Sequence, residues 1–114
     1  MNFNEYQKAI IEFDLFDNQS GTMDNPAFIA KIIGLSEESG EVAGKFKKII
    51  RDKAGQISDE DKTEIAKELG DVLWYVATIS RYLNIPLDEI AKLNLKKATG
   101  RKARGTLHGS GDNR

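Results

Sequence analysis

The sequence contains no cysteine and a single histidine among its 114 residues. Without cysteine there is no disulfide framework, no thiolate zinc site and no thiol nucleophile. One histidine cannot supply the paired histidines of the common zinc motifs or of di-iron helical bundles. Any metal site in this chain must therefore be built from other ligands.

Long apolar runs and a strong charge of either sign are also lacking. The longest apolar run, 72–79, is interrupted by Thr78 and is too short to span a bilayer. No basic segment followed by an apolar core opens the sequence, so we expect no signal peptide, no membrane partner and a cytoplasmic location. Seventeen basic residues against 18 acidic ones give a net charge of −1, which argues against a nucleic-acid partner.

The length indicates one domain, and 39% hydrophobic residues are typical of a globular one. Apolar residues recur at helical spacing in four segments, and no segment alternates as a strand does. The predicted helices cover residues 4–16, 26–55, 58–84 and 87–102. The predicted fold is an all-α bundle of about four helices, with two long central antiparallel helices. We place the domain at 1–104 and a glycine-rich tail at 105–114.

Local signals fix most of these boundaries. Asn4 is a candidate N-cap for the first helix, and a loop is expected over 17–21. Asn25 precedes a proline at the first helical position, which is a strong helix start. Ser58 and Asp61 have the spacing of a capping box. Gly55 is expected to end the second helix.

Acidic residues gather midway along both long helices. The second helix carries Glu37-Glu38-Ser39-Gly40-Glu41, and the third carries Glu68-Leu69-Gly70-Asp71. Residues three apart lie on one helical face, and both pairs border the apolar face, so antiparallel packing can bring them together. Carboxylates that converge repel one another unless a cation lies among them, and oxygen ligands suit Mg²⁺, Mn²⁺ or Ca²⁺. Ordinary solvent-exposed acids remain the alternative.

Four glycines, Gly34, Gly40, Gly44 and Gly70, fall inside the predicted central helices. Each costs roughly 1 kcal/mol relative to alanine. That cost is tolerated where a ligand or another backbone must come close. Tight helix packing and ligand approach explain the glycines equally well.

The acidic pattern, Glu-Glu-x-x-Glu followed 26 residues later by Glu-x-x-Asp, resembles that of the MazG-like nucleotide pyrophosphohydrolases of the all-α NTP pyrophosphatase superfamily. Four further stretches match the family as well. They are the segments around the acids at 35–43 and 68–75, the pattern Asn94-x-x-Lys97-x-x-x-Arg101 and the C-terminal segment 104–114. The resemblance covers about residues 30–114.

The resemblance implies hydrolysis of a nucleoside triphosphate, NTP or dNTP, to the monophosphate and pyrophosphate with Mg²⁺, for which Mn²⁺ can substitute. It implies Glu38, Glu41, Glu68 and Asp71 as metal ligands. Glu37 is the candidate that orients or deprotonates the attacking water, and Glu38 can share that role.

Basic and aromatic residues supply the candidate substrate contacts. Lys48 matches a basic position common in the family, whereas Lys45 is interpreted as part of a solvated face. Tyr75 follows Asp71 by one turn, so its hydroxyl is a candidate phosphate or sugar ligand. Residues 92–104 carry six basic residues and no acid, which also suits a helix C-terminus. Within that segment, the resemblance implies substrate contacts for Asn94, Lys97 and Arg101.

Three other functions stay open. Phosphoribosyl-ATP pyrophosphohydrolase shares the superfamily, but its second acidic motif is followed by a histidine that this chain lacks. A non-catalytic helical interaction module would bind neither metal nor nucleotide. A structural Ca²⁺-binding bundle would need no basic stripe, and this chain has one at 92–104.

Apolar residues outside the main faces, such as Ile50 and Trp74, favour burial against a partner. The family resemblance implies a homodimer or homotetramer.

Overall fold

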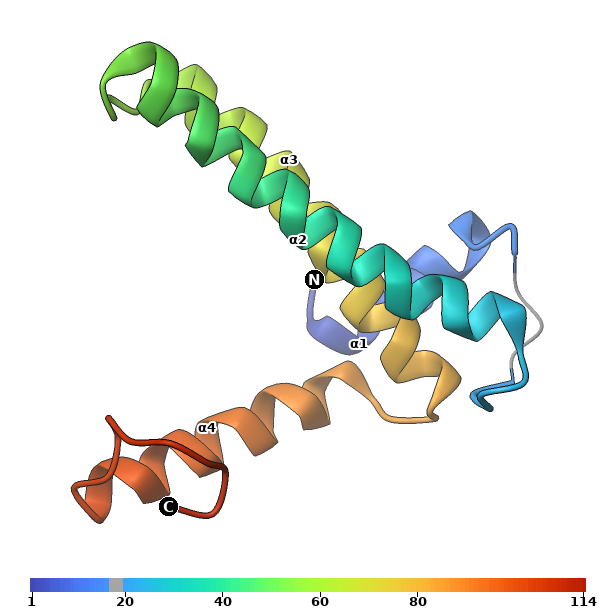
Figure 1. Cartoon of the computed structure of the whole chain (residues 1–114). Helices are drawn as coiled ribbons and strands as arrows, with labels where there is room; N and C mark the ends of the chain where they lie inside the picture. The colour runs from blue at the N-terminus through green and yellow to red at the C-terminus, as the bar shows by residue number, and fades with distance from the viewer. Residues whose placement is uncertain (17–19) are drawn as a thin grey trace.

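The computed structural model describes residues 1–16 and 20–114, which form helices and no strand (Figure 1). In chain order these are α1 (Phe3–Ala9), a 3₁₀ turn (Ile10–Phe13), α2 (Pro26–Lys53), α3 (Asp59–Tyr82) and α4 (Leu87–Ala103). The all-α prediction is confirmed for this part of the chain.

The starts of the two long helices agree with the sequence signals. The Asn25 side chain accepts a hydrogen bond from the Ala27 backbone at 3.0 Å, and Pro26 occupies the first turn. Ser58 and Asp61 cap each other reciprocally, at 2.9 Å and 3.1 Å. These bonds satisfy backbone N–H groups that have no partner within the helix. Both N-terminal predictions are therefore confirmed.

The first helix is shorter than predicted and begins earlier. Asn2, and not Asn4, is its cap, because Asn2 and Glu5 form a capping box with two 2.9 Å bonds. The α-helix ends at Ala9 and tightens into the 3₁₀ turn. α3 ends at Tyr82, two residues before the predicted end, and Asn84 has a left-handed φ of 57°. Of the predicted loop, residues 17–19 lie outside the described residues.

α2 and α3 pack against each other along their lengths as an antiparallel hairpin (Figure 1). α1 and the 3₁₀ turn pack across the C-terminal half of α3. Ile10, Ala77 and Leu87 are buried there, and Trp74 packs against them. The sequence favoured burial of Trp74 against a partner, and the structure packs this half-buried side chain against the core of its own chain. This packing holds α1 beside the middle of the hairpin.

A buried ionic network fastens the N-terminal segment to the hairpin. The Asp14 side chain is 2% exposed and receives Lys31 of α2 at 2.8 Å and Arg81 of α3 at 2.7 Å. The Tyr82 hydroxyl donates to Asp14 at 3.3 Å and to the Phe16 carbonyl at 3.2 Å. A buried carboxylate is tolerated when several donors surround it. The network therefore joins three segments that are far apart in sequence.

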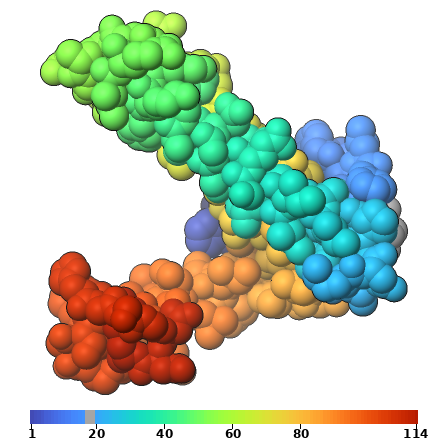
Figure 2. Space-filling view, viewed as in Figure 1, coloured from blue at the N-terminus to red at the C-terminus, as the bar shows by residue number. Residues whose placement is uncertain are grey.

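The molecule is open and not rounded. Its radius of gyration is 17.0 Å, against roughly 13 Å for a compact chain of this length. Figure 2 shows an empty notch between the α2–α3 arm and the arm formed by α4 with the residues after it. Large apolar residues on these helices are exposed, including Ile50 at 69% and Leu95 at 67%. Across the described residues, no helix combines the length and apolarity needed to cross a membrane.

Candidate functional site

Three of the predicted metal ligands meet between the two long helices. Glu38 of α2 and Glu68 and Asp71 of α3 each offer a carboxylate oxygen, and these atoms lie within 4.8 Å of one another. Glu38 and Glu68 are half-buried, whereas Asp71 is exposed. The hairpin therefore brings Glu38 to two acids that follow it by 30 and 33 residues, at a spacing at which one cation can contact all three.

The electrostatics of this acidic cluster favour a cation. Burial raises the pKa of Glu38, and the charges of Asp71, Glu37, Glu68 and Glu41 each raise that pKa further. Neighbouring negative charges raise a carboxyl pKa because they disfavour ionisation. A hard divalent ion with oxygen ligands removes this repulsion. The donor set, which consists of carboxylates alone, suits Mg²⁺ or Mn²⁺.

Glu37 and Glu41 flank the cluster without joining it. Both are exposed on α2, and neither contributes an oxygen to the group of three. Their charges are nevertheless felt by Glu38, as its pKa shows. Glu41 is about one turn of helix beyond Glu38 and therefore lies on the same side of α2.

The basic residue nearest the cluster is Lys45, which the sequence interpretation assigned to a solvated face. Its amino group lies 3.2 Å from Glu68 and 3.8 Å from Glu64. Lys48, the residue favoured from the sequence, is ten positions beyond Glu38, about 15 Å along the helix axis. Within one chain the structure does not bring Lys48 to the acids. Sequence spacing could not predict which of the two lysines lies beside the acids, because that depends on how α3 packs against α2.

Two tyrosines border the cluster. Burial raises the pKa of Tyr75, and the charge of Glu38 is the next largest cause, so the hydroxyl lies near the acids as expected. Its ring packs against Gly34, where any Cβ would clash with it. Burial also raises the pKa of Tyr6, followed by the charge of Asp71. No sequence signal pointed to Tyr6, because α1 reaches this place only through tertiary packing.

The helix-interior glycines divide into two groups. Gly34 is needed for close packing against Tyr75. At Gly40, Gly44 and Gly70 an added Cβ would meet no described atom within 4 Å. Tight packing within this chain therefore explains the first glycine and not the other three.

The three remaining predicted contacts, Asn94, Lys97 and Arg101, lie along α4. Asn94 and Lys97 are exposed and line a hollow of about 830 Å³, together with Gly100, Arg104 and Asp112. Arg101 is only 9% exposed, and its guanidinium donates to Asp112 at 2.9 Å. We call the hollow with Arg101 the α4 groove. Lys97 and Arg101 share a partner there, which supports the expectation that they face the same way.

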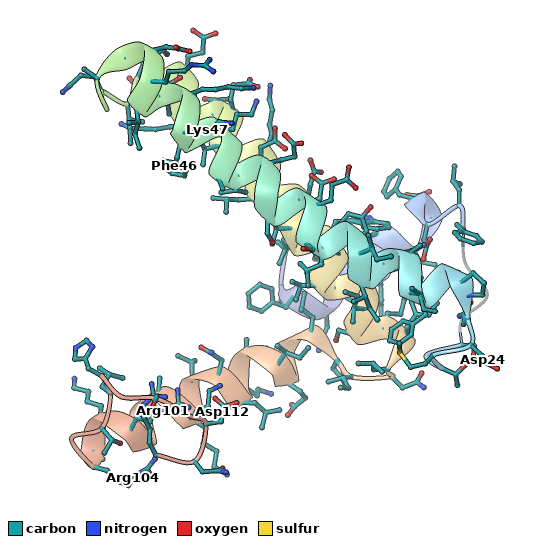
Figure 3. The ribbon with its side chains drawn as sticks, viewed as in Figure 1. Asp24, Phe46, Lys47, Arg101, Arg104 and Asp112 are labelled. Atoms are coloured by element: carbon teal, nitrogen blue, oxygen red, sulfur yellow. The ribbon has the colours of Figure 1, made fainter. Side chains whose placement is uncertain are left out.

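The acidic cluster and the α4 groove lie on different arms of the molecule. Among the described residues, no part of α2 approaches α4. Figure 3 shows the same separation, with Phe46 of α2 on one arm and Arg101 of α4 on the other. A single chain thus presents the two halves of the candidate site without bringing them together.

Comparisons with known proteins agree with this geometry. The family model for the MazG nucleotide pyrophosphohydrolase domain matches residues 29–105, which include the acidic cluster and all of α4. The chain is 49% identical over 115 residues to the "Gene 37 protein" of Mycobacterium phage L5, with all of both chains covered. No solved structure matches. The family match spans well over half of the sequence, so this chain belongs to the MazG nucleotide pyrophosphohydrolase family.

Proposed function

We propose that this protein is a Mg²⁺-dependent hydrolase that converts a nucleoside triphosphate, NTP or dNTP, to the monophosphate and pyrophosphate. The observation that carries the proposal is the convergence of Glu38, Glu68 and Asp71 within 4.8 Å. Membership of the family supports a nucleotide substrate. Removal or control of nucleotides in the cytoplasm is the cellular role that fits such a reaction.

The acids would hold the metal and prepare the water. Glu38, Glu41, Glu68 and Asp71 are the proposed ligands, with Mn²⁺ as a substitute metal. When bound, Mg²⁺ neutralises phosphate oxygens and lowers the pKa of coordinated water. Glu37 is proposed to orient or deprotonate the attacking water from the exposed edge of α2, and Glu38 can share this role. A carboxylate in that position must accept a proton at neutral pH.

The substrate carries about four negative charges, so cations must meet its phosphates as well. Lys97 and Arg101 are proposed to bind phosphate, with Asn94 bonding base, sugar or phosphate. Tyr75 is proposed to donate its hydroxyl to phosphate or sugar beside the acids. Lys48 is proposed as a further phosphate contact. In this scheme residues 1–104 carry the reaction and 105–114 form a tail.

A homodimer or homotetramer is part of the proposal. The α4 groove and the acidic cluster cannot serve one substrate within a single chain of this shape. A second copy that enters the open notch would cover exposed apolar side chains such as Ile50, and it would bring a basic arm to the acids. Burying such side chains favours association. Sedimentation velocity tests this part, and a monomer at micromolar concentration would contradict it.

The experiment that tests the function is a substrate panel. The purified protein is incubated with each canonical NTP and dNTP, with several modified ones and with phosphoribosyl-ATP, each with and without Mg²⁺, and the products are separated. We expect monophosphate and pyrophosphate only with the metal. Asp71→Asn should abolish turnover. Asp59→Asn is the matched control, since Asp59 is 98% exposed on the same helix and twelve residues away.

The other outcomes are informative. Turnover of phosphoribosyl-ATP alone would assign the protein to histidine biosynthesis. Stabilisation by Ca²⁺ without turnover would favour a structural cation site. No turnover and no thermal shift with Mg²⁺ would favour an interaction module and would overturn the proposal.

A further inference from the structure

The residues that follow α4 fold back along it and contact the α4 groove. Arg101 donates to the Asp112 carboxylate at 2.9 Å, and Lys97 lies 3.3 Å from the same oxygen. Arg101 also donates to the Gly111 carbonyl at 3.2 Å. Figure 3 shows Arg101 and Asp112 side by side, with Arg104 toward the end of the arm. One carboxylate oxygen therefore receives both cations to which the proposed function assigns phosphate binding.

The burial of the partners is unequal. The Arg101 side chain is 11% exposed, whereas the Asp112 side chain is 81% exposed. The arginine is thus part of the helix surface, and the carboxylate lies on it from the solvent side. The Arg101 Nε is buried and has no hydrogen-bond partner among the described atoms. A ligand with more oxygens than a carboxylate has could use more of the guanidinium, which offers five N–H donors.

The charge of Asp112 is firmly maintained. The hydrogen bond from Arg101 lowers its pKa, and Lys97 lowers it further. The carboxylate is therefore an anion at neutral pH. The Asp112 carboxylate would repel a phosphate that binds between the same two cations, and it already occupies their N–H donors.

The tail forms a loop with hydrogen bonds of its own. The Arg114 side chain donates to the carbonyls of Thr106 at 2.9 Å and Leu107 at 3.2 Å, which closes residues 106–114 into a loop. Gly105 joins this loop to α4 with a left-handed φ of 66°. At the start of the loop, the Thr106 backbone donates to the Arg101 carbonyl at 2.9 Å. Farther along, Arg104 donates to the Arg114 carbonyl at 2.7 Å, and Gly111 and Asp112 make the contacts to Arg101 and Lys97 given above.

We propose that the tail is a built-in competitor of the substrate: Asp112 takes the place of oligophosphate oxygens between Lys97 and Arg101, and binding of a triphosphate displaces the tail. The inference rests on the proposed phosphate role of these two cations. It assigns to the tail a control over affinity, exerted by one exposed carboxylate. The tail then slows or weakens substrate binding until the phosphates compete it away.

Calorimetric titration with inorganic triphosphate, in buffer free of divalent ions, tests the competition without any turnover. Asp112→Asn should bind triphosphate about threefold more tightly than the wild type, or better, because an exposed ion pair is worth up to roughly a factor of five. Asp88→Asn is the matched control. Asp88 pairs with Lys92 on the same helix at 2.6 Å and lies outside the α4 groove. Its affinity should equal that of the wild type.

Hydrogen exchange supplies a second readout on the wild-type protein. Triphosphate should speed exchange of the amides in residues 105–113, because the loop is released. Unchanged affinity in Asp112→Asn, or slower exchange in the tail, would overturn the inference. Weaker binding by Asp112→Asn would also overturn it, and would show that the carboxylate holds the cations in position for the ligand.

The two proposals can fail separately. If the substrate panel shows no hydrolysis but Asp112→Asn still tightens triphosphate binding, the reaction is wrong and the competition holds. If NTP hydrolysis is found and Asp112→Asn matches the control, only the competition is wrong. If neither wild type nor variant binds triphosphate, Lys97 and Arg101 are not phosphate contacts.

Discussion

Asp14 offers the strongest test of what holds the chain in the shape that forms the site. Replacing it by asparagine keeps the size of the side chain and removes its charge. Lys31 and Arg81, whose side chains are 7% and 15% exposed, then lose the carboxylate that neutralises them. Removing one partner of a buried pair costs about 3–5 kcal/mol, because the remaining charge stays buried. We expect Asp14→Asn to lose that much stability.

The loss translates into a large shift in melting temperature. For 114 residues the unfolding entropy is about 0.24 kcal/mol/K, so 3–5 kcal/mol lowers the Tm by about 12–20 °C. Scanning calorimetry at pH 7 and a fixed protein concentration measures it, since association would otherwise alter the Tm. Asp59→Asn serves as control, because the exposed Asp59–Lys62 pair should contribute little.

A double variant separates charge from packing. Lys31→Met added to Asp14→Asn removes one stranded cation, and Arg81 retains some access to solvent, so part of the lost Tm should return. The reasoning is refuted if Asp14→Asn melts no lower than Asp59→Asn. It is also refuted if adding Lys31→Met lowers the Tm of Asp14→Asn further, as a second, independent loss of stability would.

Three further predictions concern the hairpin. Gly34→Ala should destabilise the protein, since the added Cβ clashes with the Tyr75 ring and overpacking costs about 1–3 kcal/mol. Gly44→Ala should stabilise an isolated chain by about 1 kcal/mol, because its Cβ meets no described atom and alanine favours the helix. Thermal melts that rank the two variants the other way would contradict this. Lys45→Gln removes the cation beside Glu68, so Mg²⁺ should raise its Tm more than that of the wild type, and an equal shift would show that Lys45 does not offset the acids. Hydrogen bonds from Lys53 and Ser58 lower the pKa of Asp61 to about 2. The stability it contributes is therefore complete above the unfolded pKa near 4 and is lost as the pH falls toward 2, so the Tm difference between wild type and Asp61→Asn should shrink over that window, and a constant difference would exclude this linkage.

Local interactions explain what could be predicted from the sequence. The caps at Asn25 and Ser58 depend on residues within three positions, and the helical faces depend on spacings of three and four. The predicted start of the first helix was wrong because Asn2 and Asn4 both have a capping-box residue three positions later, Glu5 and Gln7. Glu5 caps Asn2, whereas the Gln7 side chain bonds distant backbone groups of Ala77, Ile85 and Leu87. Convergence of the acids could be foreseen, since it needs only two faces and an antiparallel hairpin.

Long-range contacts explain what could not be predicted. Tyr6 reaches the charge of Asp71 across 65 residues of sequence, and Asp14 meets Arg81 across 67. Neither pair lies within a motif or a periodic pattern. The position of Lys45 beside the cluster likewise depends on α3, whose Glu64 and Glu68 lie opposite this lysine. Such contacts follow from the packing of whole helices, which spacing along one helix does not encode.

The direction of α4 has the most consequence for the proposed function, because it sets where Lys97 and Arg101 lie relative to the acids. α4 joins the helical core at its first turns, where Leu87 is buried and its backbone donates to the Gln7 side chain at 3.1 Å. Beyond that point Leu93 and Leu95 are 62% and 67% exposed. A helix that exposes leucines over several turns gains stability when a partner surface covers them. At Gly40, Gly44 and Gly70 an added Cβ would meet no atom of the described residues within 4 Å, which leaves room for such a surface on the opposite arm. The same contact that buries these leucines would carry Lys97 and Arg101 toward carboxylates, so assembly and the proposed chemistry require the same arrangement of the two arms.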